Sequence, residues 1–221
     1  MTVGVLVPAA GLGVRLGPGA PKALRLLAGE PLLVHAVRGL REAAGIGPVV
    51  VAAPPGEAGE VGALLSPYDV VVVEGGPDRV DSVARALAAL APGVGLVLVH
   101  DAARCLTPPV VFACVVDALR AGAQAAVPVL PVPDTVKRVD GDRVLATLPR
   151  ADLRAVQTPQ GFRRDVLEQA HRVAGPRHTD DAGMVEALGI TVITVPGHDE
   201  AFKVTGPLDL LLAEAVLRER R

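Results

Sequence analysis

Short apolar runs alternate along the chain with segments whose apolar residues recur at helical spacing. The runs consist mainly of Val, Leu and Ala, and we expect strands at Val3–Val7, Val49–Ala53, Val70–Val73, Leu96–Val99 and Ala125–Val129. The spacing between them predicts helices over Leu32–Ala44, Ser82–Leu90 and Val110–Ala121. Strands that are apolar on both faces and alternate with helices are typical of a parallel sheet covered on both sides. The pattern therefore predicts an α/β fold with a Rossmann-like, mostly parallel sheet and helices on both faces.

The alternation is interrupted between Pro131 and Ala155. The segments Thr135–Val139 and Arg143–Leu145 flank the turn Asp140-Gly141-Asp142, which predicts a charged β-hairpin. A two-stranded hairpin is too small to be stable alone, so it must pack on another element or on a partner subunit. We expect residues 134–155 to form an arm that is inserted into a single domain of residues 1–221 and that takes part in dimerisation.

After the arm the chain returns to alternating helices and strands. We expect helices near Arg163–Val173 and Asp180–Leu188, strands at Ile190–Val195 and Phe202–Val204, and a last helix from Pro207.

Composition excludes several classes of protein. The apolar content of 50% supports a sizeable core, and the net charge of −2 provides no field that would attract a nucleic-acid backbone. No apolar run approaches the roughly 18 residues that a membrane span requires. Cys105 and Cys114 are too few for a disulfide framework and lack a metal-binding spacing. We expect a cytoplasmic protein with reduced thiols that binds neither nucleic acid nor a membrane.

The first predicted strand runs directly into a loop rich in small residues. Its sequence is Pro8-Ala9-Ala10-Gly11-Leu12-Gly13-Val14-Arg15, followed by Pro21-Lys22. Glycines allow backbone N–H groups to approach an anion, because no Cβ stands in the way. Two fixed positive charges in the same loop make a cradle for a triphosphate the favoured interpretation.

The dinucleotide-binding motif G-x-G-x-x-G is the obvious alternative for this loop. Gly11 and Gly13 fit it, but the third small residue is replaced by Leu16. The acidic residue that should end the second strand is also missing, since Val49–Ala53 runs into two prolines. The sequence therefore disfavours a dinucleotide site.

Further polar residues follow two other predicted strands. Ligands of open α/β sheets bind beyond the carboxyl ends of the strands. Gly75, Gly76 and Ser82 follow one strand, and Ser82 is either part of a ligand site or a helix cap. Asp101 and Arg104 follow another; they suit a sugar hydroxyl or a metal-bound phosphate, or they form a simple ion pair.

His100 precedes this last group, and a lone histidine that closes a strand is expected to be packed and structural.

Seven sequence blocks between Pro8 and Thr205 carry a resemblance to a known family. They are P-A-A-G-x-G-x-R with P-K, G-G-x-x-R-x-x-S-V, H-D-A-A-R, P-x-x-D-T-V-K, T-P-Q, H-T-D-D-A and K-V-T. In this order they resemble the 2-C-methyl-D-erythritol 4-phosphate cytidylyltransferases of the non-mevalonate isoprenoid pathway. The resemblance implies a nucleotidyltransferase-type fold and a homodimer. It also implies that the phosphate of methylerythritol phosphate attacks the α-phosphate of CTP, with Mg²⁺ on the phosphates and pyrophosphate released.

The resemblance also implies roles for individual residues. Arg15 and Lys22 would stabilise the transition state, while Arg150 and Lys203 would position methylerythritol phosphate, with Arg150 coming from the partner's arm. The remaining residues are Ala9, Ala10, Gly11, Gly13, Gly75, Gly76 and Ser82 for the nucleotide, and Asp101, Arg104, Thr135 and Thr158 for the substrate, with Asp101 also the candidate metal ligand.

Other functions share part of this pattern. Ribitol 5-phosphate cytidylyltransferases have similar motifs, and a CTP-binding protein without turnover is the alternative from another class. A nucleotide-sugar glycosyltransferase would need an Asp-x-Asp metal motif, whereas Asp101 is followed by two alanines. Pro77 follows the glycine pair where the family commonly has an acidic residue, so the selectivity for cytosine stays open.

Overall fold

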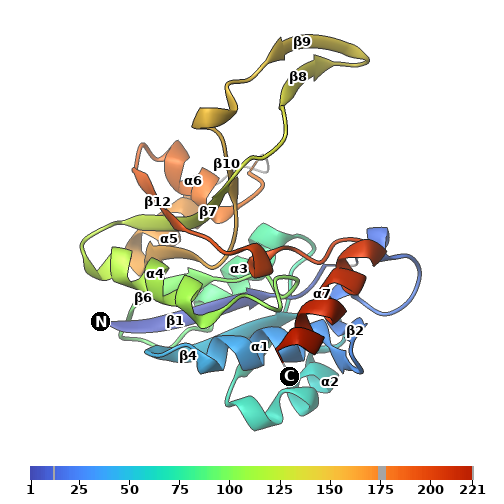
Figure 1. Ribbon diagram of the computed structural model, residues 1–221. Coiled ribbons are helices and arrows are strands. Elements are labelled where there is room, and N and C mark those ends of the chain that lie inside the picture. Colours follow the sequence, from blue (N-terminus) through green and yellow to red (C-terminus); the bar gives the residue numbers. More distant parts are fainter. Residues whose placement is uncertain (12, 174–177, 221) are drawn as a thin grey trace.

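The computed structural model describes residues 1–11, 13–173 and 178–220, so Leu12 of the glycine-rich loop lies outside the described residues. An eight-stranded sheet forms the centre of the molecule (Figure 1). Its order is β10 (Arg154–Val156), β7 (Ala125–Pro131), β11 (Gln160–Arg163), β6 (Val94–Val99), β1 (Thr2–Pro8), β4 (Ile46–Ala53) and β5 (Val71–Glu74), with β12 (Val192–Pro196) also paired with β7. Strands β6, β1, β4 and β5 are mutually parallel and β12 is parallel to β7. The predicted α/β fold with a mostly parallel sheet is confirmed.

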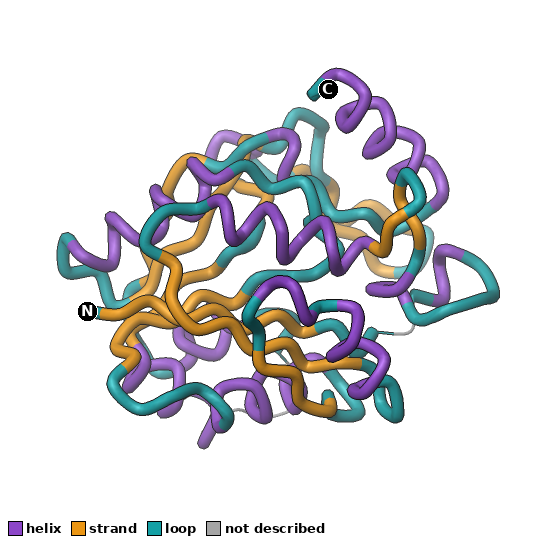
Figure 2. The backbone as a smooth tube through the Cα atoms, turned by 90° about the horizontal axis from the view of Figure 1, so that it is seen from below, coloured by secondary structure: helices purple, strands orange, loops and turns teal. Residues whose placement is uncertain are grey.

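Helices cover both faces of the sheet, and Figure 2 shows the strands between two helical layers. One core cluster joins the sheet to α1 (Leu32–Glu42), α2 (Ala58–Leu64) and α4 (Pro109–Arg120). A second cluster joins the other face to α3 (Arg79–Ala88), α5 (Arg164–Val173) and α6 (Asp181–Ala187). Strand β1 contributes to both, because Val5 and Val7 belong to the first cluster and Leu6 to the second. Each such buried side chain contributes about 1.5–3 kcal/mol, which explains why these strands read as continuous apolar runs.

Two antiparallel strands were not anticipated. β11 pairs with β6 and with β7, and it therefore separates two strands that the alternating pattern would place side by side. β10 pairs with the end of β7. β10 begins in the last two residues of the arm and β11 lies shortly after it, where the chain returns to the sheet.

The expected strand at Phe202–Val204 is wrong. These residues form no ladder, although the N–H of Val204 donates to the carbonyl of Ala103 at 2.8 Å. Their apolar side chains instead pack in a third cluster with α7 (Pro207–Glu219) and the start of α1. This packing holds the segment beside the end of β6, where Lys203 contacts Asp101.

The remaining elements are short. They are β2 (Leu26–Leu27), β3 (Glu30–Pro31) and five 3-10 turns: η1 (Val14–Leu16), η2 (Lys22–Leu24), η3 (Ser66–Tyr68), η4 (Arg150–Asp152) and η5 (Asp199–Ala201).

The predicted arm is present as a hairpin of β8 (Lys137–Asp140) and β9 (Arg143–Thr147). Figure 1 shows it extending away from the sheet and its helices. Val139, Val144 and Leu145 are more than half exposed there, although an apolar side chain gains nothing from contact with water.

Among the described helices, none combines the length and the apolar character that a membrane crossing requires.

Candidate active site

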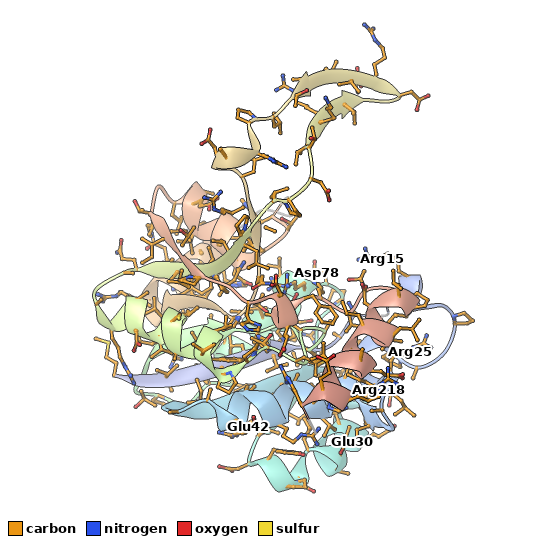
Figure 3. The ribbon with its side chains drawn as sticks, in the orientation of Figure 1. Arg15, Arg25, Glu30, Glu42, Asp78 and Arg218 are labelled. Carbon is orange, nitrogen blue, oxygen red and sulfur yellow. The ribbon has the colours of Figure 1, made fainter. Side chains whose placement is uncertain are left out.

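A cavity of about 540 Å³ opens at the carboxyl ends of β1, β5 and β6. This is where ligands of open α/β sheets bind. Its lining residues are Pro8, Ala9, Ala10, Gly11, Gly13, Arg15, Lys22, Ala23, Gly76, Pro77, Asp78, Arg79, Ser82, Asp101, Ala102, Ala103, Lys203 and Thr205. Four sequence segments that lie far apart in the chain, within residues 8–23, 76–82, 101–103 and 203–205, therefore meet around one cavity. Arg15 and Asp78, two of the lining residues, are labelled in Figure 3.

Backbone hydrogen bonds fix the glycine-rich loop at both ends. The N–H of Ala9 donates to the carbonyl of Ala52 at 2.8 Å, and the N–H of Lys22 donates to the carbonyl of Gly11 at 3.1 Å. Gly13 has φ of 69°, and a Cβ there would lie 2.6 Å from the Cβ of Lys22. Only glycine combines that backbone conformation with such a close approach. The loop thus brings the stem of Lys22 against its own turn, with Arg15 on the same cavity.

The Lys22 ammonium lies in an electropositive, partly buried position. Burial and the positive charges of Lys203 and Arg15 lower its pKa to about 8, against the opposing attraction of Asp101. A cation in these surroundings is stabilised by any polyanion that enters the cavity.

The loop after β5 is held in shape by Ser82. Its hydroxyl donates to the carbonyl of Asp78 at 2.7 Å and accepts the N–H of Gly76 at 3.0 Å. The cap of α3 is Asp78, whose carboxylate accepts the N–H of Asp81 at 2.8 Å, so the alternative of Ser82 or Asp81 as the cap is wrong.

Gly75 supports this loop from behind without lining the cavity. A Cβ at this position would lie 2.6 Å from both the Cβ of Ala10 and the carbonyl oxygen of Ala53. The loop after β5 can therefore approach the loop after β1 this closely only because Gly75 has no side chain.

Asp101 lies between two cations. Its Oδ2 is 2.6 Å from Nζ of Lys203, and its Oδ1 is 3.3 Å from Nε of Arg79. Burial alone would raise the pKa of this carboxyl, but the charges of Arg79 and Lys203 hold it well below its usual range. Asp101 is therefore an anion at any physiological pH, and it pairs with these two residues rather than with Arg104.

Thr158 and His100 hold the backbone at Asp101. The N–H of Asp101 donates to Oγ1 of Thr158 at 3.0 Å, and this oxygen is 3.2 Å from Nδ1 of His100. The His100 ring packs against Phe112 with centroids 4.9 Å apart, and burial lowers its pKa to about 4. His100 is a neutral, packed residue, as the sequence predicted.

Arg104 is directed at the backbone. Its guanidinium donates to the carbonyl of Ala201 at 2.6 Å and to that of Val156 at 3.1 Å, and it does not line the cavity. These bonds tie η5 and β10 to the end of β6. A direct contact of Arg104 with substrate stays a prediction.

Thr135 and Arg150 belong to the arm, and neither lines the cavity of its own chain. The Arg150 guanidinium donates to the carbonyl of Pro133, joining the two segments that lead into the hairpin. Their expected roles toward substrate stay predictions.

Arg79 and Asp181 also belong to the site, although the motifs that contain them, G-G-x-x-R-x-x-S-V and H-T-D-D-A, indicate no role for either residue. Nη1 of Arg79 is 2.6 Å from Oδ2 of the fully buried Asp181, and its Nε contacts Asp101. Because 102 residues separate Arg79 from Asp181, no local spacing could have revealed the pair. The described residues contain no cluster of three or more His, Cys, Asp or Glu side chains suited to a metal ion.

Fold and site together define an α/β protein of the nucleotidyltransferase type. The sequence model of IspD, 2-C-methyl-D-erythritol 4-phosphate cytidylyltransferase, matches residues 3–219. The chain belongs to this family.

Curated relatives and a solved structure agree with this membership. The 2-C-methyl-D-erythritol 4-phosphate cytidylyltransferase of Streptomyces avermitilis is 55% identical over 229 residues, covering 98% of this chain and 92% of the relative. The protein of the same description from Saccharopolyspora erythraea is 56% identical over 224 residues, covering 98% and 100%. The crystal structure of the 2-C-methyl-D-erythritol 4-phosphate cytidylyltransferase from Thermus thermophilus superposes with a TM-score of 0.83 at 43% identity, covering 99% of this chain and 100% of that one.

Proposed function

We propose that this protein transfers CMP from CTP to 2-C-methyl-D-erythritol 4-phosphate and releases pyrophosphate. The observation that supports this most directly is the convergence of Arg15, Lys22, Asp101 and Lys203 on one cavity in a chain that belongs to this family throughout its length. A triphosphate needs several fixed cations, and the first loop supplies two of them.

The reaction requires no protein base. A phosphate oxygen of the acceptor is already an anion, so it attacks the α-phosphorus of CTP directly. The bond from that phosphorus to the bridging oxygen breaks, and pyrophosphate leaves with the electron pair. Catalysis then consists of positioning and of charge stabilisation. We assign the triphosphate to Arg15 and Lys22.

Lys203 is suited to bind the acceptor phosphate. Its side chain is 41% exposed, while its ammonium contacts only one oxygen of Asp101. It can therefore turn toward an incoming phosphate while Arg79 remains on the other oxygen of the same carboxylate. This arrangement supports a role for Lys203 in positioning the acceptor.

The cavity fits Mg²⁺ that is bound mainly through substrate phosphates. Mg²⁺ in such sites takes one or two carboxylates together with phosphate oxygens, and Asp101 is a carboxylate that lines the cavity and whose pKa is held low by the neighbouring cations Arg79 and Lys203. When bound, the ion neutralises phosphate charge. Asp101 would hold it, with Lys203 giving up its contact on Oδ2.

We also propose a homodimer in which the arm, residues 134–155, completes the partner's site. Support comes from the apolar residues of β8 and β9, which stay exposed beside all the described elements of their own chain. Thr135 and Arg150 lie on the arm and outside their own chain's cavity. We place the reaction in the cytoplasm, where nucleoside triphosphates are available.

A pyrophosphate-release assay with CTP, Mg²⁺ and a panel of polyol phosphates tests this function. We expect turnover with methylerythritol phosphate. Preferential turnover with ribitol 5-phosphate would reassign the acceptor, and binding of CTP without turnover by any acceptor would contradict the enzyme function.

CTP should be used better than UTP, by roughly 10- to 100-fold in kcat/KM. Ala10, Gly76 and Ser82 line the cavity, and a fixed backbone that pairs with the cytosine edge leaves polar groups unpaired when uracil enters, at about 1–3 kcal/mol. Ser82→Ala should reduce this preference, because it frees the N–H of Gly76.

The control for this experiment is Ser66→Ala, which removes the exposed and only other serine of the chain. Equal use of UTP and CTP by the unmodified protein would contradict the base-pocket assignment.

The pH dependence should report Lys22. Its charged form is the active one and its pKa in the free protein is about 8, so kcat/KM for CTP should fall as the pH rises above about 8. Bound triphosphate favours the charged ammonium, so the corresponding fall in kcat should lie at higher pH. In Lys22→Arg the fall of kcat/KM above about pH 8 should disappear, because a guanidinium does not lose its proton in this pH range. If kcat/KM of that variant still falls above about pH 8, the titrating group is a residue other than Lys22.

A further inference from the structure

A line of hydrogen-bonded polar side chains leads from Asp101 through Arg79 and Asp181 to His171, in the helical layer behind the cavity. Arg79 contacts Asp101 through Nε at 3.3 Å and Asp181 through Nη1 at 2.6 Å. The other oxygen of Asp181 is 3.0 Å from Nε2 of His171. The line therefore joins the end of β6 to the first residue of α3, the first residue of α6 and the last turn of α5.

Asp181 is the fixed end of this line. Its side chain is 0% exposed, and a buried carboxylate is costly unless cations and hydrogen-bond donors surround it. Arg79 supplies the charge. His171 supplies a donor, and because its Nδ1 is buried without a partner in the described structure, we assign the ring proton to Nε2.

Arg79 connects this fixed end to the cavity. A guanidinium is a planar fork whose N–H donors point in fixed directions, so it can hold two carboxylates in a defined arrangement, whereas the donors of an ammonium have no such fixed plane. The Arg79 side chain is 26% exposed and lines the cavity, whereas both of its partners are largely or fully buried. It is also the first residue of α3, directly after the loop of Gly76 and Asp78. The same side chain thus fixes the loop of Gly76 and Asp78 relative to Asp101.

The two cations on Asp101 differ in how firmly they are held. Lys203 is more exposed and ends on Asp101 alone among the described contacts, so it can leave. Arg79 is held from behind by Asp181, so it stays. Without that anchor, the Arg79 guanidinium would be free to follow the phosphates of an entering nucleotide.

We propose that Asp181 and His171 are positioning residues that act through Arg79, holding its guanidinium against Asp101 while Lys203 binds the acceptor phosphate. This inference rests on the proposed function. In this proposal the two residues do not contact substrate. Their effect is to keep the Asp101 carboxylate and the start of α3 in a fixed relative position.

Three variants test the coupling: Arg79→Lys, Asp181→Asn and the double variant. Each single change should lower kcat/KM about 10- to 100-fold, the usual cost of losing a supporting contact behind a metal-binding residue such as the one we propose at Asp101. Because Asp181 acts through Arg79, the double variant should lose no more than Arg79→Lys alone. Calorimetric titration with CTP, with and without Mg²⁺ and without acceptor, should show weakened binding in the same variants.

The matched control is Asp180→Asn. Asp180 is the neighbouring residue; it caps α6 through the N–H of Gly183 at 3.1 Å and accepts from Gln160 at 2.7 Å, whereas the ion pairs of Arg79 among the described residues are with Asp101 and Asp181. It should lower thermal stability and leave kcat and CTP affinity close to those of the unmodified protein.

Several outcomes would overturn the inference. Losses that multiply in the double variant would show that Asp181 acts independently of Arg79. A change in thermal stability alone, with kinetics and CTP binding unchanged, would make the line purely structural.

If Asp181→Asn does not fold, His171→Leu and His171→Gln decide the question. Gln retains a donor for Asp181 and should be active, whereas Leu should lose activity and CTP affinity, and equal behaviour of the two would contradict the inference. If the unmodified protein transfers CMP to no acceptor, the proposed function is refuted. The CTP titrations would still show whether Asp181 and His171 act through Arg79.

Discussion

Lys22→Ala is expected to lower kcat about 10²–10³-fold, the usual cost of removing one donor that is directed at developing charge. The ammonium lies in the cavity because its backbone is bonded to Gly11 and its stem passes against Gly13. The attack on the α-phosphorus moves negative charge onto the leaving pyrophosphate, and this cation is in place before that charge develops. Steady-state release of pyrophosphate at saturating CTP measures the loss.

Lys22→Arg should also be poor, although it keeps the charge. The planar guanidinium is longer than the ammonium and does not fit a site shaped for a compact group. Because the side-chain stem packs closely against Gly13, it cannot shift to make room for the longer group. Arg218→Ala is the control for removing a cation: Arg218 is exposed on α7, away from the cavity (Figure 3). Near-normal kcat in Lys22→Arg would contradict a specific role for lysine at this position.

The sheet was predictable because its strands carry a local signal. β1, β4 and β6 are buried on both faces, so each appears as an apolar run whatever lies around it. β11 has no such signal: it has four residues, and it becomes a strand by pairing with β6 about sixty residues earlier in the chain. Its pairing partner is fixed by the tertiary fold, and no periodicity within Gln160–Arg163 indicates it.

The segment Phe202–Val204 has the apolar pattern of a short strand without forming one. Its apolar residues suggested a strand, but they are apolar because they pack beneath α7 in the third core cluster. The same fact explains why Lys203 lies at the cavity, since its two neighbours are anchored inward while its own side chain turns to the open side. A pattern of burial in a short segment does not distinguish a ladder from a packed extended chain.

Site residues were predictable where they follow strand ends in the sequence. Arg15, Lys22, Ser82 and Asp101 all line the cavity, because the carboxyl ends of parallel strands meet at one edge. The ion pair between Arg79 and Asp181 behind Asp101 was not predictable, since its two residues lie about a hundred positions apart in the chain.

The contacts of Arg104 could not be predicted either. Its type suits a phosphate, yet the fold directs its guanidinium to two backbone carbonyls.

Mixing two inactive variants, Lys22→Ala and Arg150→Ala, should restore activity if the arm works in the partner's site. In a mixed dimer one site combines the intact Lys22 of one chain with the intact Arg150 of the other, and the opposite site carries both lesions. Random exchange of equal amounts makes about half of the dimers mixed, so about a quarter of the unmodified activity should return. The measurement is pyrophosphate release after subunit exchange, with dimers verified by size-exclusion chromatography.

The matched control for this experiment is a mixture of Lys22→Ala with Lys203→Ala. Both lysines line the same cavity of one chain, so no mixed dimer contains a site with both of them intact, and this mixture should stay inactive. Restoration in the first mixture and not in the second separates a shared site from mere stabilisation of one subunit by the other. If neither mixture regains activity while both variants remain dimeric, Arg150 acts within its own chain, and its bond to the carbonyl of Pro133 defines a structural role in the arm.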